Sequence, residues 1–290
     1  MPEHFAAAAA LLPPMLRRAA LHEPLPRRAS CEELRLRVGR APTLRLPEGE
    51  TPFAETALTG ADLAAVLENA TGASLHAYAE QLRRGFVCAP GGVRLGVCGT
   101  AVMDGGDVHT IRGVSSLCVR VARQKPGAGA AVLPRLWGKS VLILSAPGGG
   151  KTTFLRELVR SQSDAGVRVA LADERGELAG LTPEGVPGFD LGRCTDVLSG
   201  APKAAAALLL LRAMGPEVVA MDELGDASDA AAVTALMGSG VRVFATAHAA
   251  DLAALRRRPV LRGLVEGGAF DALVRIRGAG ANRVYEVETL

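Results

Sequence analysis

Aromatic residues are scarce in this sequence: phenylalanine, tyrosine and tryptophan make up 3% of its 290 residues. Proteins that bind single-stranded nucleic acid usually present aromatic side chains on which bases stack, so the scarcity argues against that class. The sequence also lacks a long apolar run, because the most apolar stretch, residues 204–215, is short and contains Arg212. We therefore expect any contact with a membrane to be peripheral.

The cysteine pattern excludes another kind of site. The cysteines are odd in number, form no C-x-x-C pair and have no histidine at metal-ligand spacing. We expect small core residues in a reducing compartment rather than disulfides or zinc ligands. The five are Cys31, Cys88, Cys98, Cys118 and Cys194.

No strong charge imbalance is present either. The formal net charge is +3 and the pI is about 8.7, which permits contact with nucleic acid or an anionic membrane but favours neither. The apolar run "FAAAAALL" near the N-terminus has no lysine or arginine before it and is followed by Pro13 and Pro14. The sequence therefore predicts no secretory signal peptide.

The first part of the chain has the pattern of a small domain. Residues 1–33 mix alanine, proline and arginine, and are predicted as one short helix and a linker. In residues 34–124, alternating apolar and basic residues, a helical stretch near 60–84 and short runs between glycine pairs predict an α+β domain. The following "QKPGAGA", residues 124–130, has linker composition.

Residues 131–290 change to a repeating order of strand, loop and helix, which predicts an α/β domain. Short continuous apolar runs of this kind are typical of parallel strands that are buried on both faces. The predicted strands are 141–144, 168–172, 218–221, 241–245 and 272–276.

The stretch "SVLILSAPGGGKTT" contains a strand, a glycine-rich turn and the start of a helix. Gly150, Lys151 and Thr152 fall in register with the phosphate-loop pattern G-x-x-x-x-G-K-[ST]. Glycines let backbone N–H groups approach a triphosphate, the helix N-terminus adds its positive dipole end, and the lysine reaches the outer phosphates. The predicted nucleotide-binding residues are Ser145, Ala146, Pro147, Gly148, Gly149, Gly150, Lys151, Thr152 and Thr153.

Ser145 departs from this pattern, because it stands where the first glycine is expected. That position ends the strand, whereas the backbone of residues 148–152 makes the close approach to phosphate. A serine with negative φ can occupy such a turn. We therefore expect a tolerated substitution.

Two acids end a later apolar strand in "EVVAMDELG". Parallel strands place their carboxyl ends at one edge of the sheet, so these acids are expected near Lys151. Asp222, together with Thr152, is predicted to bind magnesium, and Glu223 to orient the attacking water.

Other polar residues are expected at the same edge. The strand in "VFATAHAADL" ends in Thr246 and His248, which can sense a γ-phosphate and relay its loss. Strand 168–172 runs into "DERGELAG", whose acids include Glu174, a further catalytic candidate. The charged residues of this segment are Asp173, Glu174, Arg175 and Glu177.

Phosphoryl transfer usually also needs an arginine that faces the developing charge, supplied by the same chain or by a partner. Four arginines of the first domain are candidates, and Arg112 is the one we select. They are Arg94, Arg112, Arg120 and Arg123.

The order of the phosphate loop, "DERGELAG", "RCTDVLSGAPKA", "VVAMDELG" and "ATAHA" resembles the stage III sporulation protein AA family, a branch of the type II and type IV secretion ATPases. The upstream "VRLGVCGTAVMDGGDVHTIRGVSSLCVRVAR" looks like the N-terminal domain of that family. The resemblance covers residues 34–277. It implies a RecA-like P-loop NTPase domain behind the smaller α+β domain, with Mg²⁺ and ATP as its cofactors.

By match of motif, the resemblance makes Lys151 and Thr152 the Walker A pair, and Asp222 and Glu223 the Walker B pair. It makes His248 the histidine box, and the segment "DERGE" the aspartate box. The zinc-ligand cysteines of some secretion ATPases are missing here. Together with Ser145, this is the departure from the pattern.

The resemblance also implies a setting for the protein. Related secretion ATPases form hexameric rings with nucleotide between the domains, so a homo-oligomer is expected. The family is linked to the channel between mother cell and forespore, where it is thought to energise assembly or transport. This implies integral membrane proteins of the channel as partners and a cytoplasmic location, peripheral to the membrane on the mother-cell side.

Three other readings stay open at this point. A RecA-like ATPase driven along nucleic acid fits the mild basic charge, but no recognised nucleic-acid module is present and no direct contact with nucleic acid is expected. An ABC-type ATPase subunit would explain the "LSG" around Leu198, but its spacing from Lys151 is too short for the usual helical insert. A scaffold that binds nucleotide without hydrolysing it has Ser145 as its supporting feature. A GTPase is disfavoured because no N-K-x-D motif is present.

Overall fold

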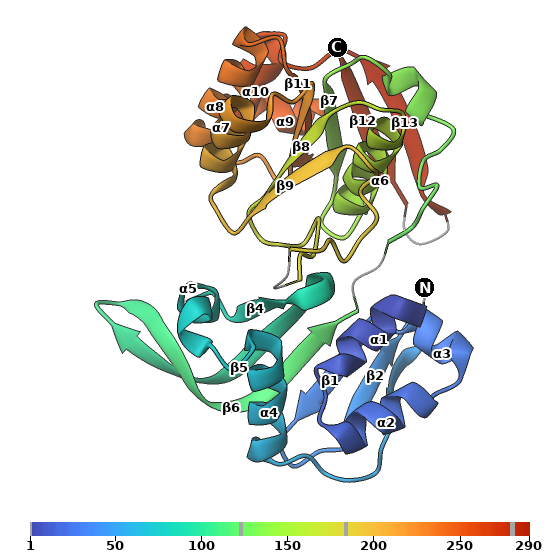
Figure 1. The fold of residues 1–290 in the computed structure, drawn as a ribbon, viewed down its shortest axis with the longest axis vertical. Coiled ribbons are helices and arrows are strands. Elements are labelled where there is room, and N and C mark those ends of the chain that lie inside the picture. Colours follow the sequence, from blue (N-terminus) through green and yellow to red (C-terminus); the bar gives the residue numbers. More distant parts are fainter. Residues whose placement is uncertain (1, 122–123, 183–184, 279–281) are drawn as a thin grey trace. The chain divides into compact units, whose positions relative to one another are not determined.

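The structure is a computed structural model that describes residues 2–121, 124–182, 185–278 and 282–290 (Figure 1). The chain divides into two compact units. The first comprises Met1–Gln124 and Gly180–Phe189, and the second comprises Lys125–Ala179 and Asp190–Leu290. Within the described residues, no helix combines the length and the apolar character needed to cross a bilayer.

The first unit contains a six-stranded antiparallel sheet in the order β3-β2-β1-β6-β5-β4. Alternation sets its two faces: Leu34 and Leu36 of β1 are fully buried, whereas Arg35 and Arg37, which alternate with them, are partly exposed. The strands are β1 (Glu33–Arg37), β2 (Thr43–Leu46), β3 (Gly49–Pro52), β4 (Phe86–Ala89), β5 (Val93–Asp104) and β6 (Asp107–Arg120).

The N-terminal residues form more helix than the sequence indicated. Where one short helix and a linker were expected, there are three helices, two of which begin beside a proline that suits the first helical turn. Phe5, Leu16 and Ala20 from these helices join the same apolar core as the sheet. The helices are α1 (Pro2–Ala10), α2 (Pro14–His22) and α3 (Leu25–Ser30).

The helical stretch expected near 60–84 is divided. It begins with a capping box between Thr59 and Asp62 and is interrupted at Gly72, whose φ of 55° ends the first helix. The pieces are α4 (Gly60–Thr71), a 3₁₀ turn (Leu75–Tyr78) and α5 (Ala79–Arg83). A further 3₁₀ turn covers Pro90–Gly92.

The second unit has a seven-stranded sheet in the order β13-β12-β7-β11-β10-β8-β9. All neighbouring strands are parallel except β12 and β13. The five predicted strands are confirmed with small shifts at their ends, and β9 and β13 were missed. The strands are β7 (Val141–Ser145), β8 (Val169–Asp173), β9 (Thr195–Ser199), β10 (Val218–Met221), β11 (Arg242–His248), β12 (Ala272–Arg277) and β13 (Val284–Thr289).

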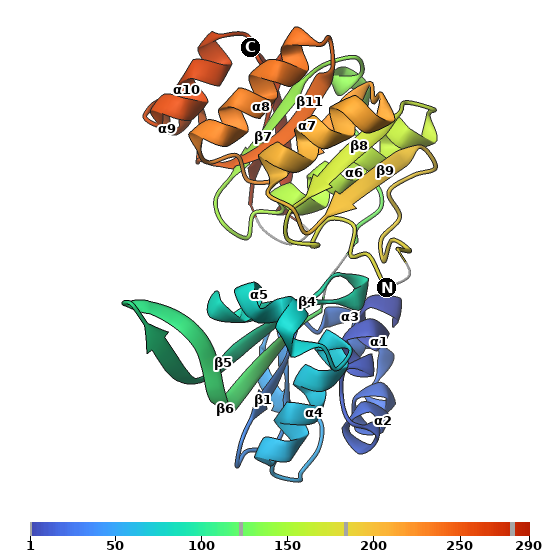
Figure 2. The same cartoon turned by 60° about the vertical axis from the view of Figure 1, so that its left-hand side comes forward.

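Helices cover both faces of this sheet (Figures 1 and 2). Leu142 and Leu144 of β7 belong to one buried cluster with residues of α7, α8 and α10, whereas α6 packs against the sheet from the opposite face. The helices are α6 (Lys151–Asp164), α7 (Lys203–Met214), α8 (Ala227–Gly238), α9 (Leu252–Arg256) and α10 (Pro259–Glu266), with a 3₁₀ turn at Leu133–Leu136.

The parallel register brings the functional motifs to one edge of the sheet. In this register His248 of β11 lies opposite Ser145 of β7, and Met221 of β10 lies opposite Ala172 of β8 and Ala245 of β11. The loops that follow β7, β8, β10 and β11 therefore begin side by side, as expected at the carboxyl edge of an α/β sheet.

Candidate functional site

The loop after β7 has the backbone of a phosphate-binding turn. Ser145 ends the strand with its side chain buried, and α6 begins at Lys151. Gly148 and Gly150 adopt φ values of 73° and 100°, which only glycine adopts readily. A Cβ added at Gly149 would collide with the Ser145 hydroxyl oxygen, so this serine is accommodated because a glycine faces it. Ser145 itself needs no left-handed backbone.

Lys151 points back into this loop. It is 4% exposed, and its Nζ donates to the carbonyl oxygens of Ser145 at 3.2 Å and Ala146 at 3.3 Å. Burial lowers the pKa of Lys151, while the nearby charges of Asp222 and Glu223 oppose that change. The ammonium group is thus held by weak neutral acceptors at the position from which a phosphate-loop lysine reaches phosphate.

His248 continues the contacts of Lys151. Its Nδ1 lies 3.0 Å from Lys151 Nζ, and its Nε2 lies 3.0 Å from Glu223 Oε1. Because an ammonium group can only donate, Nδ1 accepts, and Nε2–H then donates to the Glu223 carboxylate. His248 therefore connects the lysine of α6 to the acid after β10.

Thr152 and Asp222 form the pair that suits a magnesium ion. The Thr152 hydroxyl donates to Asp222 Oδ2 at 2.9 Å, and the Thr246 hydroxyl donates to the other carboxylate oxygen. Mg²⁺ prefers oxygen ligands and is commonly held by one or two protein side chains together with water and substrate phosphates. The hydroxyl and carboxylate oxygens present here therefore fit that ion.

Thr246 connects the two acids. Its side chain is fully buried, and its oxygen also accepts the backbone N–H of Glu223 at 2.8 Å. One hydroxyl thus fixes both the Asp222 carboxylate and the turn that follows β10. A threonine rather than a valine is needed at this point of β11, since a methyl group can do neither.

Replacing Thr246 with valine is expected to reduce the free energy of unfolding by about 1–3 kcal/mol, because the Asp222 oxygen and the Glu223 N–H would lose their partner in a buried environment. Denaturant unfolding of both proteins measures the change. Thr234→Val is the matched control, since the exposed Thr234 hydroxyl bonds only to Ala230 of its own helix. Equal losses in the two variants would contradict this role for Thr246.

Glu223 has an unusual backbone conformation. Its φ is 55°, in the left-handed region, which costs a residue with a side chain about 1–3 kcal/mol. Its Oε2 lies 2.7 Å from Arg175 Nη1, opposite the contact with His248. Burial alone would raise the pKa of Glu223, but the His248 hydrogen bond and the charges of Arg175 and Lys151 bring it below its usual value.

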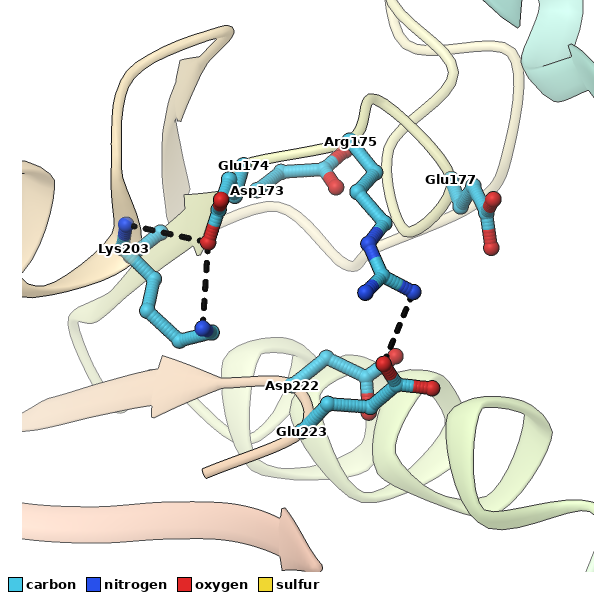
Figure 3. Close-up of a pocket in the computed structure, with 8 residues that line it drawn as sticks. Asp173, Glu174, Arg175, Glu177, Lys203, Asp222 and Glu223 are labelled. Carbon is cyan, nitrogen blue, oxygen red and sulfur yellow. Dashed lines mark hydrogen bonds and ion pairs between the residues drawn. The ribbon is translucent and has the colours of Figure 1, made fainter. Parts of the chain in front are cut away.

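Two consecutive acids, the last residue of β8 and the one that follows it, have different partners (Figure 3). Asp173 is 2% exposed and accepts the N–H groups of Leu178 at 3.2 Å and Ala179 at 2.8 Å, while burial raises its pKa. Glu174 instead pairs with Lys203 at the start of α7, at 3.0 Å. The Glu174 carboxylate therefore faces α7, and its catalytic role stays a prediction.

Three arginines near the phosphate loop had no role in the sequence prediction. The guanidinium of the buried Arg156 donates to the carbonyls of Glu177 and Leu178, both at 2.8 Å. Arg258 Nη1 donates to the His248 carbonyl at 3.3 Å, and Arg283 Nη2 to the Gly148 carbonyl at 3.5 Å. No local motif marks them, because each contact joins segments that are distant in the sequence.

The arginines predicted to complete the site belong to the first unit, except that Arg123 lies outside the described residues. Arg94 lies over the Phe86 ring at 4.0 Å, and Arg120 lies 3.6 Å from Glu33. Arg112 is in the ladder of β5 and β6. All contacts of the site given above are within the second unit, so Arg112 stays a prediction as the completing arginine.

Comparison with solved structures identifies the class to which this fold belongs. The chain is similar to the ATPase DotB of Legionella pneumophila, with a TM-score of 0.58, 16% identity, and coverage of 90% of this chain and 76% of that one. It is equally similar to the pilus retraction motor PilT with bound ADP, with a TM-score of 0.58, 16% identity, and coverage of 90% and 79%. The protein has the fold of a RecA-like P-loop NTPase with a smaller N-terminal α+β domain, as the sequence predicted.

The family follows from closer relatives. Residues 7–285 match the family described as sporulation stage III, protein AA. The chain is also 34% identical over 250 residues to stage III sporulation protein AA of Bacillus subtilis (strain 168), which covers 82% of this chain and 81% of that protein. The chain belongs to the stage III sporulation protein AA family, and the resemblance noted in its motifs is confirmed.

Proposed function

We propose that this protein is a magnesium-dependent ATPase of the secretion type. One observation carries the proposal: the pair Lys151 and Thr152 meets the distant pair Asp222 and Glu223 at one edge of the sheet. Thr152 contacts Asp222 directly, and His248 contacts both Lys151 and Glu223. A glycine-rich turn with no ligand would need neither the buried lysine nor the paired acids.

The same side chains have distinct roles in the proposed reaction. Lys151 exchanges its carbonyl partners for the β- and γ-phosphates of ATP, which accept charge-assisted hydrogen bonds more strongly. Thr152 and Asp222 would hold Mg²⁺, directly or through water, and the ion would neutralise charge on these phosphates.

Hydrolysis forms a bond between a water oxygen and the γ-phosphorus and breaks the bond between that phosphorus and the β,γ-bridging oxygen. ADP leaves with the electron pair of the broken bond, and Glu223 accepts the proton that the water loses. His248 contacts both Lys151 and Glu223, so it is placed to couple loss of the γ-phosphate to movement of the acid. An arginine of the first domain or of a neighbouring subunit, with Arg112 as our candidate, would complete the site.

The biological setting is a proposal that rests on the family. We expect a ring of identical subunits, hexameric by analogy with secretion ATPases. The ring would act on the mother-cell side of the membrane and use integral membrane proteins of a sporulation channel as partners. Hydrolysis would energise assembly of the channel or transport through it.

The test is ATP hydrolysis with Mg²⁺ at increasing protein concentration, for the wild type and Glu223→Gln, with and without single-stranded DNA. We expect a rate per chain that rises with concentration and ignores DNA. In Glu223→Gln, kcat should fall by about 10²- to 10⁴-fold, the usual contribution of a general base, while ATP still binds. Normal turnover in this variant would remove Glu223 from catalysis, and strong stimulation by DNA would favour a motor that acts on nucleic acid.

A further inference from the structure

Arg175, in the segment after β8, contacts Glu223, and none of the motifs gives this arginine an individual role. We infer that Arg175 is a positioning residue that fixes the carboxylate of Glu223 for the reaction. The inference rests on the proposed ATPase function. It adds a cationic residue to the site from the same chain and the same unit as Glu223.

The first support is that Glu223 is held from both neighbouring strands. In the sheet, β10 lies between β8 and β11. Arg175 follows β8 and contacts Oε2 at 2.7 Å, whereas His248 ends β11 and contacts Oε1 at 3.0 Å. Each oxygen of the carboxylate has its own partner on a different side, so the plane of the carboxylate is fixed as well as its position. Figure 3 shows the contact with Arg175.

The second support is the backbone of Glu223. With φ at 55°, this residue lies in a conformation that its neighbours must maintain. The Thr246 hydroxyl holds its N–H, and among the described residues its carboxylate contacts Arg175 and His248. Without Arg175, the side chain would keep a single partner and could rotate about its last bond.

The third support is that the segment that carries Arg175 is held in place. Asp173 accepts two N–H groups from residues 178–179, and the buried Arg156 of α6 donates to the carbonyls of Glu177 and Leu178. These contacts tie the segment that carries Arg175 to β8 and to the phosphate-loop helix. The guanidinium is therefore presented from a fixed loop, as a positioning residue requires.

Arg175 and Glu223 line one pocket together with Lys203, the other cation there, and Lys203 cannot take the place of Arg175. Lys203 contacts Glu174 at 3.0 Å and Asp229 at 3.4 Å, and Figure 3 shows its ammonium group bound to the Glu174 carboxylate. The remaining charged residues that line this pocket are acids, among them Asp222. Arg175 is thus the residue of this pocket that can orient Glu223 by attraction rather than by repulsion.

The experiment compares Arg175→Ala and Arg175→Lys with the wild type under saturating Mg²⁺. We expect Arg175→Ala to lower kcat by about 10- to 100-fold, the size of effect that a misplaced catalytic group produces, with KM for ATP changed by less than about twofold. Arg175→Lys should recover part of kcat, because a cation remains. Arg168→Ala is the matched control, since the exposed Arg168 contacts Glu217 and Gly215 at the opposite end of β8.

A double-mutant comparison separates this role from a structural one. In the Glu223→Gln background, measured in single-turnover reactions, Arg175→Ala should cost less than about twofold, because a residue that acts through Glu223 has nothing left to position. Equal losses in both backgrounds, a kcat unaffected by Arg175→Ala, or an effect confined to KM would each overturn the inference. Failure of the wild type to hydrolyse ATP, or undiminished activity of Lys151→Ala, would overturn the proposed function instead.

Discussion

Replacing Lys151 with alanine is expected to weaken ATP binding by about 30-fold to several thousandfold, since removing one partner of a buried charge pair costs about 2–5 kcal/mol. The side chain is 4% exposed and aims its ammonium group into the glycine-rich loop, so the loop amides alone would have to hold the phosphates in the variant. Titration calorimetry with Mg²⁺ and ATP measures the affinity directly, without depending on turnover.

The matched control is Lys139→Ala, because Lys139 precedes β7 at the end of the strand that is opposite to the phosphate loop. This variant should bind ATP as the wild type does. Thermal unfolding of both variants shows whether a loss of affinity comes from a loss of structure. Wild-type affinity in a folded Lys151→Ala protein would contradict the assignment of residues 145–153 as the nucleotide site.

The main residues of the site could be predicted because the motif residues follow predicted parallel strands, and such strands end at one edge of the sheet. A parallel strand buried on both faces is an unbroken apolar run, and the residue after it must lie at the carboxyl edge of the sheet. Lys151, Asp222 and His248 each follow such a run, so their proximity could be inferred without knowing the strand order. The contact between Thr152 and Asp222 is of this kind, and the structure places the two oxygens 2.9 Å apart.

The contacts that decide the orientation of these side chains could not be predicted. Arg175 and Glu174 are neighbours in one charged segment, yet the first faces Glu223 and the second faces Lys203. Sequence position gives no direction for a side chain in a loop, because the loop backbone follows neither the helical nor the strand period. The left-handed conformation of Glu223 has no signal in the sequence either, since the residue that adopts it is not a glycine.

Strands β9 and β13 and most of the N-terminal helices were missed because their sequences lack the patterns that marked the other elements. Strand β9 is only partly buried, and β13 alternates polar and apolar residues at the edge of the sheet, so neither forms the continuous apolar run that marked the central strands. At the N-terminus, the mixture of alanine, proline and arginine suggested a linker, although Pro13 precedes α2, which packs into the core, and Pro24 precedes α3. A proline just before or within the first turn begins a helix as readily as it ends one.

Replacing Asp222 with asparagine is expected to raise the Mg²⁺ concentration needed for half-maximal ATP hydrolysis by at least about tenfold, a loss typical of removing one group from a metal site. The amide keeps the size of the side chain and its ability to contact the hydroxyls of Thr152 and Thr246, so the local structure should persist. Only the negative charge is lost, and a hard cation such as Mg²⁺ depends on that charge. The measurement is the hydrolysis rate at fixed ATP over a series of Mg²⁺ concentrations.

The control for this charge removal is Asp196→Asn, because Asp196 is exposed on β9 and takes no part in the contacts of the site. Its Mg²⁺ dependence should equal that of the wild type. A rate in Asp222→Asn that high Mg²⁺ restores would place the carboxylate at the ion, whereas an unchanged Mg²⁺ dependence with a lower kcat would place it at the attacking water. The second outcome would move the metal role away from Asp222 and leave Thr152 as its one remaining side-chain ligand among those assigned.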